Sequence, residues 1–197
     1  NKPLHVLHVF GRLNRGGAES RVMDLYRNVD RTRVQFDFMQ HTTKVCDFQT
    51  EIEQLGGKVY HVPPFRFWNY FSYCKAWKEF IKEHPEIRIV HGHMTSTASI
   101  YLPIVRKKGV FTIAHSRNAG VDKGIKGKLT KFLRRNLKEK CDRCFACSKL
   151  AGEAVFGKKA MEQGRVTIIP NAIDAARFTF DPEVRRQKRE ELHIQPE

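Results

Sequence analysis

Two adjacent glycines, Gly16 and Gly17, stand where a short apolar segment gives way to an amphipathic one. Glycine lets the backbone approach a ligand closely, and the free amides at the start of a helix attract an anion together with the helix dipole. The pair predicts either a site for a diphosphate or a tight strand-to-helix turn without a ligand. A G-x-G-x-x-G fingerprint is absent, and a phosphate loop would need Lys followed by Ser or Thr where Ala18 and Glu19 stand.

Two histidines, His91 and His93, follow the apolar segment that reaches Val90. Side chains at i and i+2 of an extended chain point the same way, so the pair could contribute to a metal site. A zinc site needs three or four ligands, and the neighbouring sequence offers neither H-x-x-x-H nor paired cysteines. We therefore expect no metal here.

A third group, His115, Arg117 and Asn118, comes just after the apolar residues 110–114. A histidine at this point could donate a hydrogen bond to a sugar hydroxyl, and Arg117 could bind an anionic group. A lone histidine is also common in a purely structural position. A place directly after a strand favours a role in binding, because ligands of parallel sheets lie beyond the strand ends.

The spacing of Cys141, Cys144 and Cys147 resembles part of an iron–sulfur motif. The fourth cysteine of that motif would fall at position 151, which is Ala151. Buried thiols in an apolar strand are the favoured interpretation. Five cysteines, an odd number, argue against a disulfide framework and agree with a reducing compartment.

The elements that must position these residues alternate between strand-like and helix-like periodicity. Strands are expected at residues 4–10, 34–41, 58–62, 87–91 and 110–114, around Phe145, and in a segment ending at Pro170. Helices are expected at residues 18–29, 47–55, 70–81, 125–138 and 148–156. Strands separated by helices imply crossover connections, and hence a Rossmann-like, doubly wound, mainly parallel α/β sheet with helices on both faces.

Length and composition limit the class of protein. A chain of 197 residues with 41% hydrophobic and 29% charged residues makes one large globular domain. The sequence shows neither an apolar run of about 18 residues nor a signal peptide, so a cytoplasmic location is expected. The formal net charge of +15 favours polyanionic partners, namely nucleic acid, nucleotide phosphates or an anionic membrane.

Residues 123–140 combine eight Lys and Arg residues with apolar residues at helical spacing. Such a helix can cover the sheet or lie on anionic lipid, and we favour the covering role with a secondary membrane contact. An aromatic cluster could form an acceptor or lipid contact, or part of the core. It comprises Phe65, Phe67, Trp68, Tyr70, Phe71 and Tyr73.

Taken in order, five short segments resemble the acceptor-side, N-terminal domain of a family-four GT-B retaining glycosyltransferase. They are the Gly16-Gly17 loop, His91 with His93, His115, Ala146-Cys-Ser148 and Pro170-Asn-Ala-Ile-Asp174. The resemblance implies transfer of a sugar, of hexosyltransferase type, from a UDP- or GDP-linked donor to a saccharide or lipid-linked saccharide, with retained configuration and without a bound metal. It implies no nucleic-acid partner.

The same resemblance assigns roles to the residues singled out above. Gly16 and Gly17 would lie near the donor phosphates, and His115 would contact the transferred sugar as the catalytic histidine. His93, Arg117 and Asn118 would line the acceptor side. Departing diphosphate charge would have to be stabilised by preorganised amides and cationic side chains.

The resemblance also predicts how the chain is divided. Residues 1–178 would form the first domain, and residues 179–197 a charged helix or linker toward a nucleotide-sugar-binding domain, so the isolated domain should be inactive. Glu183 and Glu191 have the spacing of that second domain's E-x7-E motif, but they precede it and are interpreted as solvated charges.

Two alternatives from other classes stay open on the sequence. A basic α/β module could bind nucleic acid, although no recognition motif accompanies the positive charge. A nucleotide-binding redox domain would need the glycine fingerprint and an acidic residue at the end of the second strand, where Gln40 and His41 stand.

Overall fold

The computed structural model describes residues 2–120, 124–173 and 175–195. At its centre is a seven-stranded sheet in the order β3-β2-β1-β4-β5-β6-β7, and all of the described neighbouring strands pair in parallel. The strands are β1 (Leu4–Phe10), β2 (Val34–Gln40), β3 (Val59–His61), β4 (Ile87–Gly92), β5 (Phe111–Ser116), β6 (Arg143–Ala146) and β7 (Val166–Ile168). The predicted Rossmann-like, doubly wound α/β fold is confirmed.

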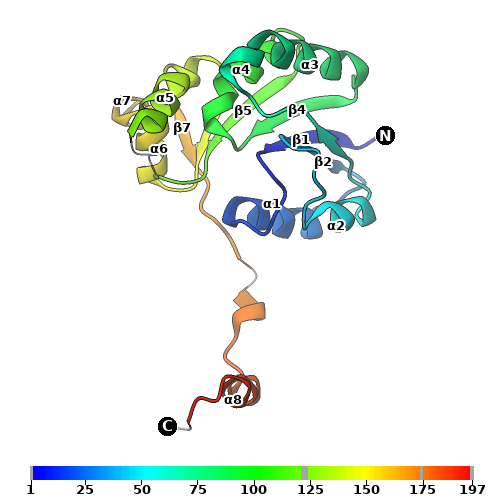
Figure 1. The fold of residues 1–197 in the computed structure, drawn as a ribbon, viewed down its shortest axis with the longest axis vertical. Helices are drawn as coiled ribbons and strands as arrows, with labels where there is room; N and C mark the ends of the chain where they lie inside the picture. Colours follow the sequence, from blue (N-terminus) through cyan, green and yellow to red (C-terminus); the bar gives the residue numbers. More distant parts are fainter. Residues whose placement is uncertain (1, 121–123, 174, 196–197) are drawn as a thin grey trace.

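Helices lie on both faces of this sheet (Figure 1). They are α1 (Gly17–Asn28), α2 (Gln49–Gln54), α3 (Tyr70–Glu83), α4 (Thr95–Arg106), α5 (Gly124–Arg134), α6 (Lys149–Phe156), α7 (Lys158–Glu162) and α8 (Pro182–Glu191), with 3-10 turns η1 (Phe67–Asn69), η2 (Leu137–Glu139) and η3 (Ala175–Phe178). One hydrophobic core lies beneath α1 and α2 and contains Val22, Tyr26 and Ile52. The other lies beneath α3 and α4 and contains Trp77 and Leu102.

Strand β1 is buried on both faces. Val6 and Phe10 belong to the core under α1, and Leu7 and Val9 belong to the core under α4. Burial of each such side chain contributes about 1.5–3 kcal/mol. Because successive side chains of a strand alternate between faces, His8 lies on the same face as Val6 and Phe10 and must find its partners on neighbouring strands.

The sequence patterns did not predict α4 or α7. Residues 95–99 of α4 carry hydroxyl and β-branched side chains with weak helix propensity, and Pro103 inside the helix lacks a backbone N–H. Packing decides the conformation instead, since Ala98, Leu102 and Val105 are completely buried against the sheet. Helix α5 is also shorter than the predicted basic helix.

The predicted basic helix 123–140 ends early because the chain turns at Asn136. This residue has a φ of 59°, in the left-handed region, and the next residues form the short turn η2. Leu137 in that turn is buried. Lys123, the first residue of the basic segment 123–140, lies outside the described residues.

The packing of α4 against the end of β4 leaves no space for a side chain at position 92, which is Gly92. A Cβ atom at this position would collide with the hydroxyl of Tyr101 on α4. Tyr101 is completely buried and stacks on Trp77 with 4.5 Å between ring centroids. The close approach of α4 to β4 therefore depends on glycine at position 92.

The cysteines near β6 do not converge on one point. Cys141 and Cys144 are buried in the core under α4, with 3.5 Å between their sulfur atoms. Cys147 lies on the opposite face, where its Sγ donates a 3.2 Å hydrogen bond to the carbonyl oxygen of Arg117. The three thiols therefore do not share the geometry of a cluster site.

After β7 the chain leaves the body as an extended segment and ends in α8, which lies apart from the sheet (Figure 1). Helix α8 has no buried residue. Its charges pair within the helix, where Arg186 contacts Glu183 at 2.6 Å and Glu190 at 2.7 Å. Such pairs contribute a few tenths of a kcal/mol each. The boundary at residue 178 stays a prediction, and Asp174 lies outside the described residues.

No helix in the described part of the chain is both long enough and apolar enough to span a bilayer.

Candidate active site

Strands β1 and β4 are neighbours, yet β1 leads to α1 on one face of the sheet and β4 leads to α4 on the other. Ligands of open α/β sheets bind outside the carboxyl ends of the strands at such a switch point. An open cavity of about 610 Å³ lies here, within the roughly 300–1,000 Å³ common for small-ligand sites. Its lining residues are Phe10, Gly11, Gly17, Ala18, Glu19, Arg21, His93, Met94, Arg117, Asn118, Asn171 and Ile173.

Of the two adjacent glycines, Gly17 is among the residues that line the cavity and Gly16 is not. Gly17 is the first residue of α1 and lines the cavity, with nothing within 4 Å of where a Cβ would stand. Gly16 precedes the helix in an extended conformation, and a Cβ there would meet the carboxylate of Glu19. The N-cap residue Gly16 has no side chain to cap α1, so the amide of Gly17 is open to a ligand, whereas the amide of Glu19 bonds its own carboxylate.

Glu19 is the acidic residue of the cavity. It lies in the first turn of α1, where the helix dipole favours negative charge. Burial raises the pKa of its carboxyl above the usual value, whereas a hydrogen bond from its own backbone amide and the nearby charge of Arg117 act in the opposite direction. The carboxylate therefore occupies a place that also suits an anionic ligand.

Arg117 brings positive charge to the cavity just beyond β5. Its Nε donates to Nδ1 of His93 at 3.0 Å, and its Nη1 donates to Oδ1 of Asn171 at 3.4 Å. Burial lowers the pKa of Arg117 to about 10, so the guanidinium remains charged at neutral pH. Arg21 of α1 adds a second cation and donates to the carbonyl oxygen of Ala172 at 2.9 Å.

Arg117 belongs to a cluster with four imidazoles, which we call the histidine rim: His8, His91, His93, His115 and Arg117. Nδ1 of His8 lies 3.0 Å from Nε2 of His93, and Nε2 of His91 lies 3.0 Å from Nδ1 of His115. Burial, with the charge of Arg117, lowers the pKa of both His8 and His115 to about 3 and holds those of His91 and His93 well below the usual value. All four rings are therefore neutral at pH 7.

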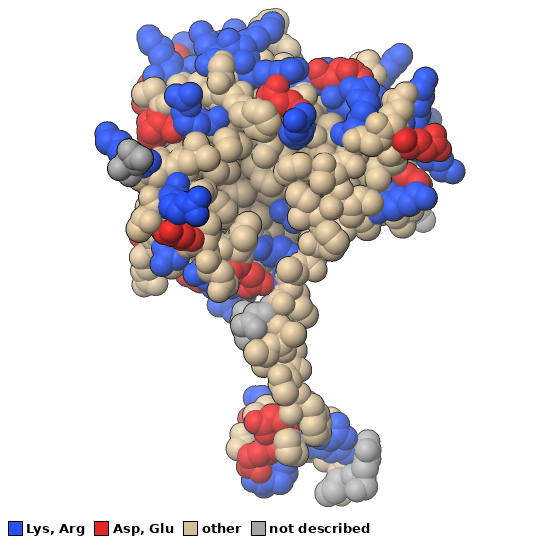
Figure 2. All heavy atoms as spheres, turned by 180° about the vertical axis from the view of Figure 1, so that it is seen from behind, with Lys and Arg blue, Asp and Glu red and all other residues tan. Residues whose placement is uncertain are grey.

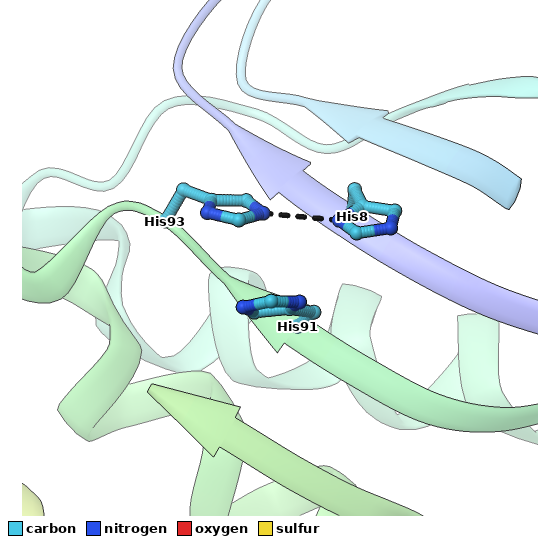
Figure 3. A group of neighbouring side chains, drawn as sticks. All are labelled: His8, His91 and His93. Atoms are coloured by element: carbon cyan, nitrogen blue, oxygen red, sulfur yellow. Dashed lines mark hydrogen bonds between the residues drawn. The ribbon is translucent and has the colours of Figure 1, made fainter. Parts of the chain in front are cut away.

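Three of these rings lie close enough to suggest a metal site. His8, His91 and His93 each place a nitrogen within 4.8 Å of the others (Figure 3). A ligating nitrogen needs a free lone pair, but Nδ1 of His93 already accepts from Arg117 and Nε2 is hydrogen-bonded to His8. A neutral imidazole has only one such lone pair, and Arg117 adds a repelling charge. The residues fit a hydrogen-bonded chain better than a metal ion.

The residues expected from the sequence fall at different depths. Gly17, His93, Arg117 and Asn118 line the cavity, and Asn118 is exposed. His115 does not line it: the residue is only 1% exposed and its ring contacts that of His91. The roles expected for these residues remain predictions.

Other residues of the site escaped the sequence patterns. Glu19, Arg21 and Asn171 line the cavity. The sequence patterns pointed to the glycines and to the Pro170-Asn-Ala-Ile-Asp174 segment, but not to these side chains. The sequence patterns did not indicate His8, because it lies in the middle of an apolar strand. A polar residue in a strand that is buried on both faces was the one available signal.

Comparison with known proteins gives a consistent result. Residues 15–177 match the family described as Glycosyltransferase Family 4. The chain is 36% identical over 178 residues to the putative glycosyltransferase EpsF of Bacillus subtilis strain 168, covering 88% of this chain and 46% of EpsF. It is 30% identical over 91 residues to the capsular polysaccharide biosynthesis glycosyltransferase CapH of Staphylococcus aureus, covering 46% of this chain and 24% of CapH.

The chain also superposes on about half the length of two solved structures. A glycosyltransferase from Rickettsia africae superposes with a TM-score of 0.69 at 14% identity, over 100% of this chain and 51% of that protein. HepE of Anabaena, in complex with UDP and glucose, superposes with a TM-score of 0.70 at 15% identity, over 96% of this chain and 50% of HepE. At these identities the similarity shows the fold alone.

Proposed function

The chain belongs to glycosyltransferase family 4, and we propose that it forms the acceptor-side half of a retaining glycosyltransferase. The reaction moves a sugar from a UDP- or GDP-linked donor to a saccharide or lipid-linked saccharide. One observation carries the proposal: free helix amides at Gly17 and the guanidinium groups of Arg21 and Arg117 line a single cavity at the switch point. That combination suits the diphosphate of a nucleotide sugar.

In this proposal the cavity stabilises departing diphosphate with preorganised groups. The family resemblance assigns Arg117 to the acceptor side, but because it lines the same cavity as the start of α1 we propose that it also meets the diphosphate. The helix amides and the guanidinium are already oriented, so they need little reorganisation as negative charge develops. The protein's own cations would serve without a metal ion. His93 and Asn118, which line the same cavity next to Arg117, would contact the acceptor.

The proposed role of His115 depends on the family resemblance. Its ring lies behind the cavity wall, beside His91, and its buried Nε2 has no hydrogen-bond partner among the described residues. A movement of the wall on ligand binding would be needed to bring that nitrogen to the transferred sugar. A polar atom left unpaired in this way is costly and therefore points to a partner in another state.

The activity test uses the full-length protein from the reading frame that contains this chain, assayed with a panel of UDP- and GDP-linked sugars. We expect release of nucleoside diphosphate, and loss of turnover in Arg117→Met and His115→Ala while circular dichroism shows a retained fold. The 197-residue chain alone should bind pyrophosphate without turnover. A folded full-length protein that consumes none of the donors would refute the proposal. Oligonucleotide binding that survives physiological salt would favour the nucleic-acid alternative.

We further propose a peripheral contact with an anionic membrane, carried by a groove of about 1140 Å³ between α3, α4 and α5. The apolar side chains of this basic groove are Tyr70, Phe71, Ile100, Pro103, Ile104, Phe132 and Leu133, and its cations are Lys75, Lys78, Lys107, Lys108, Arg135 and Lys140. No carboxylate is among the described residues that line it. Phe71 is 85% exposed and Phe132 is 66% exposed.

An apolar surface with a cationic border is the composition expected for contact with anionic lipid. Lys and Arg gather over the upper part of the body in Figure 2, where Figure 1 places α3 and α4. Helix α3 follows β3 through residues 62–69, a connection that leaves from the carboxyl end of the strand, and the cavity also lies at carboxyl ends of strands. A lipid-linked acceptor could therefore approach the cavity from this side. The aromatic cluster expected from the sequence is partly surface and partly core, because Phe71 is exposed whereas Tyr73 is buried.

Vesicle co-sedimentation tests this contact. We expect the chain to bind vesicles of phosphatidylcholine with phosphatidylglycerol, and not vesicles of phosphatidylcholine alone. Combined Phe71→Ser and Phe132→Ser substitution should reduce binding about 30-fold or more, because each aromatic ring buried in the membrane contributes more than about 1 kcal/mol. Phe178→Ser with Phe180→Ser, at exposed positions outside the groove, is the matched control. Equal binding by both double variants would exclude the groove as the contact surface.

A further inference from the structure

The guanidinium of Arg117 determines where the protons of two neighbouring imidazoles lie. An arginine N–H can only donate. Since Arg117 Nε lies 3.0 Å from His93 Nδ1, that nitrogen must accept and carries a lone pair. A neutral imidazole has one donor and one acceptor nitrogen, so the proton of His93 is on Nε2.

The same reasoning extends to the next ring. His93 Nε2 lies 3.0 Å from His8 Nδ1, and Figure 3 marks this hydrogen bond. Because Nε2 of His93 carries the proton, Nδ1 of His8 must accept the bond. The proton of His8 is then on Nε2, a buried nitrogen for which the described part of the chain offers no hydrogen-bond partner. Its surroundings include Phe36, with 4.4 Å between ring centroids, and Phe38, with 5.7 Å. The chain of bonds thus runs in one direction, from Arg117 through His93 to His8, and ends against apolar rings.

Packing leaves His93 little freedom to satisfy Arg117 in another way. Its ring stacks on Phe10 with 4.4 Å between centroids and 10° between planes, and it contacts His91 at 4.3 Å. Because the ring is held in place, the position of its proton decides whether Nδ1 can accept. With the proton on Nδ1 instead, two donors would face each other across the 3.0 Å contact with Arg117.

We infer that His8 is a positioning residue for Arg117: by accepting a hydrogen bond from His93, it holds His93 in the one tautomer that can accept from the guanidinium. His8 is 2% exposed and does not line the cavity, so it acts without touching a ligand. The inference rests on the proposed function only for the identity of the anion that Arg117 binds. The hydrogen bond to Arg117 is charge-assisted, the kind whose loss weakens positioning most.

Nuclear magnetic resonance of the chain tests the tautomers directly. The imidazole nitrogens of wild-type His93 should report a protonated Nε2 and an unprotonated Nδ1. In His8→Leu the Nε–H of Arg117 should exchange with water about tenfold faster or more, and the affinity for inorganic pyrophosphate should fall by a similar factor. His8→Gln, which keeps an acceptor, should restore part of both.

The matched control is His41→Phe. His41 is a buried histidine beside the same strand ends and bonds to the carbonyl oxygen of Phe10 and to the hydroxyl of Tyr73, not to Arg117. We expect it to leave the exchange of Arg117 Nε–H unchanged. Thermal unfolding of each variant shows whether the fold is retained.

Two results would overturn the inference: a proton on Nδ1 of His93 in the wild-type chain, or equal exchange of Arg117 Nε–H in His8→Leu and His41→Phe. The first needs no variant, so it does not depend on how His8→Leu folds. A slowly exchanging Arg117 Nε–H together with no affinity for pyrophosphate would refute the proposed phosphate site and leave the positioning role of His8 supported.

Discussion

In the histidine rim one guanidinium lies among three buried imidazoles and the half-buried His91, whereas in the basic groove six Lys and Arg side chains surround apolar side chains at the protein surface. The rim holds its cation in a fixed direction through the bonds from Arg117 to His93 and Asn171. The exposed groove lysines Lys107 and Lys108 sit on flexible stems.

The two regions should therefore respond differently to pH, salt and substitution. At the rim, the free energy depends on the position of single protons and on burial, so it should be sensitive to pH and to single substitutions. At the groove it depends on the number of charges and is screened by salt. The following predictions are ordered by the size of the expected effect.

Acid should destabilise the fold through the rim. The folded pKa of about 3 for His8 and His115 lies below the unfolded value of 6.5, so the unfolded chain binds more protons between these limits. Stability should be constant above pH 6.5 and fall as the pH falls toward 3, by about 1.4 kcal/mol per pH unit for each such histidine. Urea unfolding at a series of pH values measures this slope. His8→Phe should reduce the slope by one histidine's share, and an unchanged slope would contradict the assignment.

Removing the positive charge of Arg117 should strongly weaken the binding of pyrophosphate. Arg117→Met should weaken pyrophosphate binding about 100-fold, because a charge-assisted bond contributes up to about 3 kcal/mol. Arg117→Lys keeps the charge and loses the fixed Nε–H, so an intermediate affinity is expected. Calorimetric titration distinguishes the three proteins. Equal affinity of Arg117→Lys and wild type would mean that direction does not matter at the rim.

The groove should lose function independently of the rim. Lys107→Glu with Lys108→Glu should reduce binding to anionic vesicles about tenfold or more, since each basic residue contributes about 1 kcal/mol near the surface. Raising the salt from 0.1 to 1 M, which shortens the Debye length from about 10 to about 3 Å, should have a similar effect. The double variant should bind pyrophosphate normally, and Arg117→Met should bind vesicles normally. If either variant weakened the binding of both pyrophosphate and vesicles, the rim and the groove would not be independent binding sites.

The smallest expected effect is a gain. Glu19→Gln removes the carboxylate that lies at the start of α1 beside the cavity, so pyrophosphate should bind about threefold more tightly, as expected for one charge at a helix N-terminus. Glu162→Gln removes an equal charge at an exposed position of α7 and should have no effect. Weaker binding by Glu19→Gln would show that the carboxylate supports the site.

Much of the fold could be predicted because its signals are local. Strand β1 was expected at residues 4–10 and is observed at Leu4–Phe10, since an apolar segment is followed directly by glycine punctuation. Helix α4 could not be predicted, because its residues 95–99 and Pro103 oppose a helix and packing on β4 and β5 overrides them.

The site was predictable only where the strand ends themselves are polar. His93 and Arg117 follow strands, and the parallel sheet brings them together. His8 gave no such signal, because its partner His93 lies 85 positions further along the chain. The register of β1 on β4 aligns His8 with His91 and so brings His8 close to His93, two residues further along the chain.

The glycine at the end of β4 has an evolutionary consequence. Because the phenol of Tyr101 fills the space of a methyl group at position 92, the two positions are not free to vary separately. We expect homologous sequences to keep the pair or to change both members at once, and Gly92→Ala to be rescued in part by Tyr101→Phe.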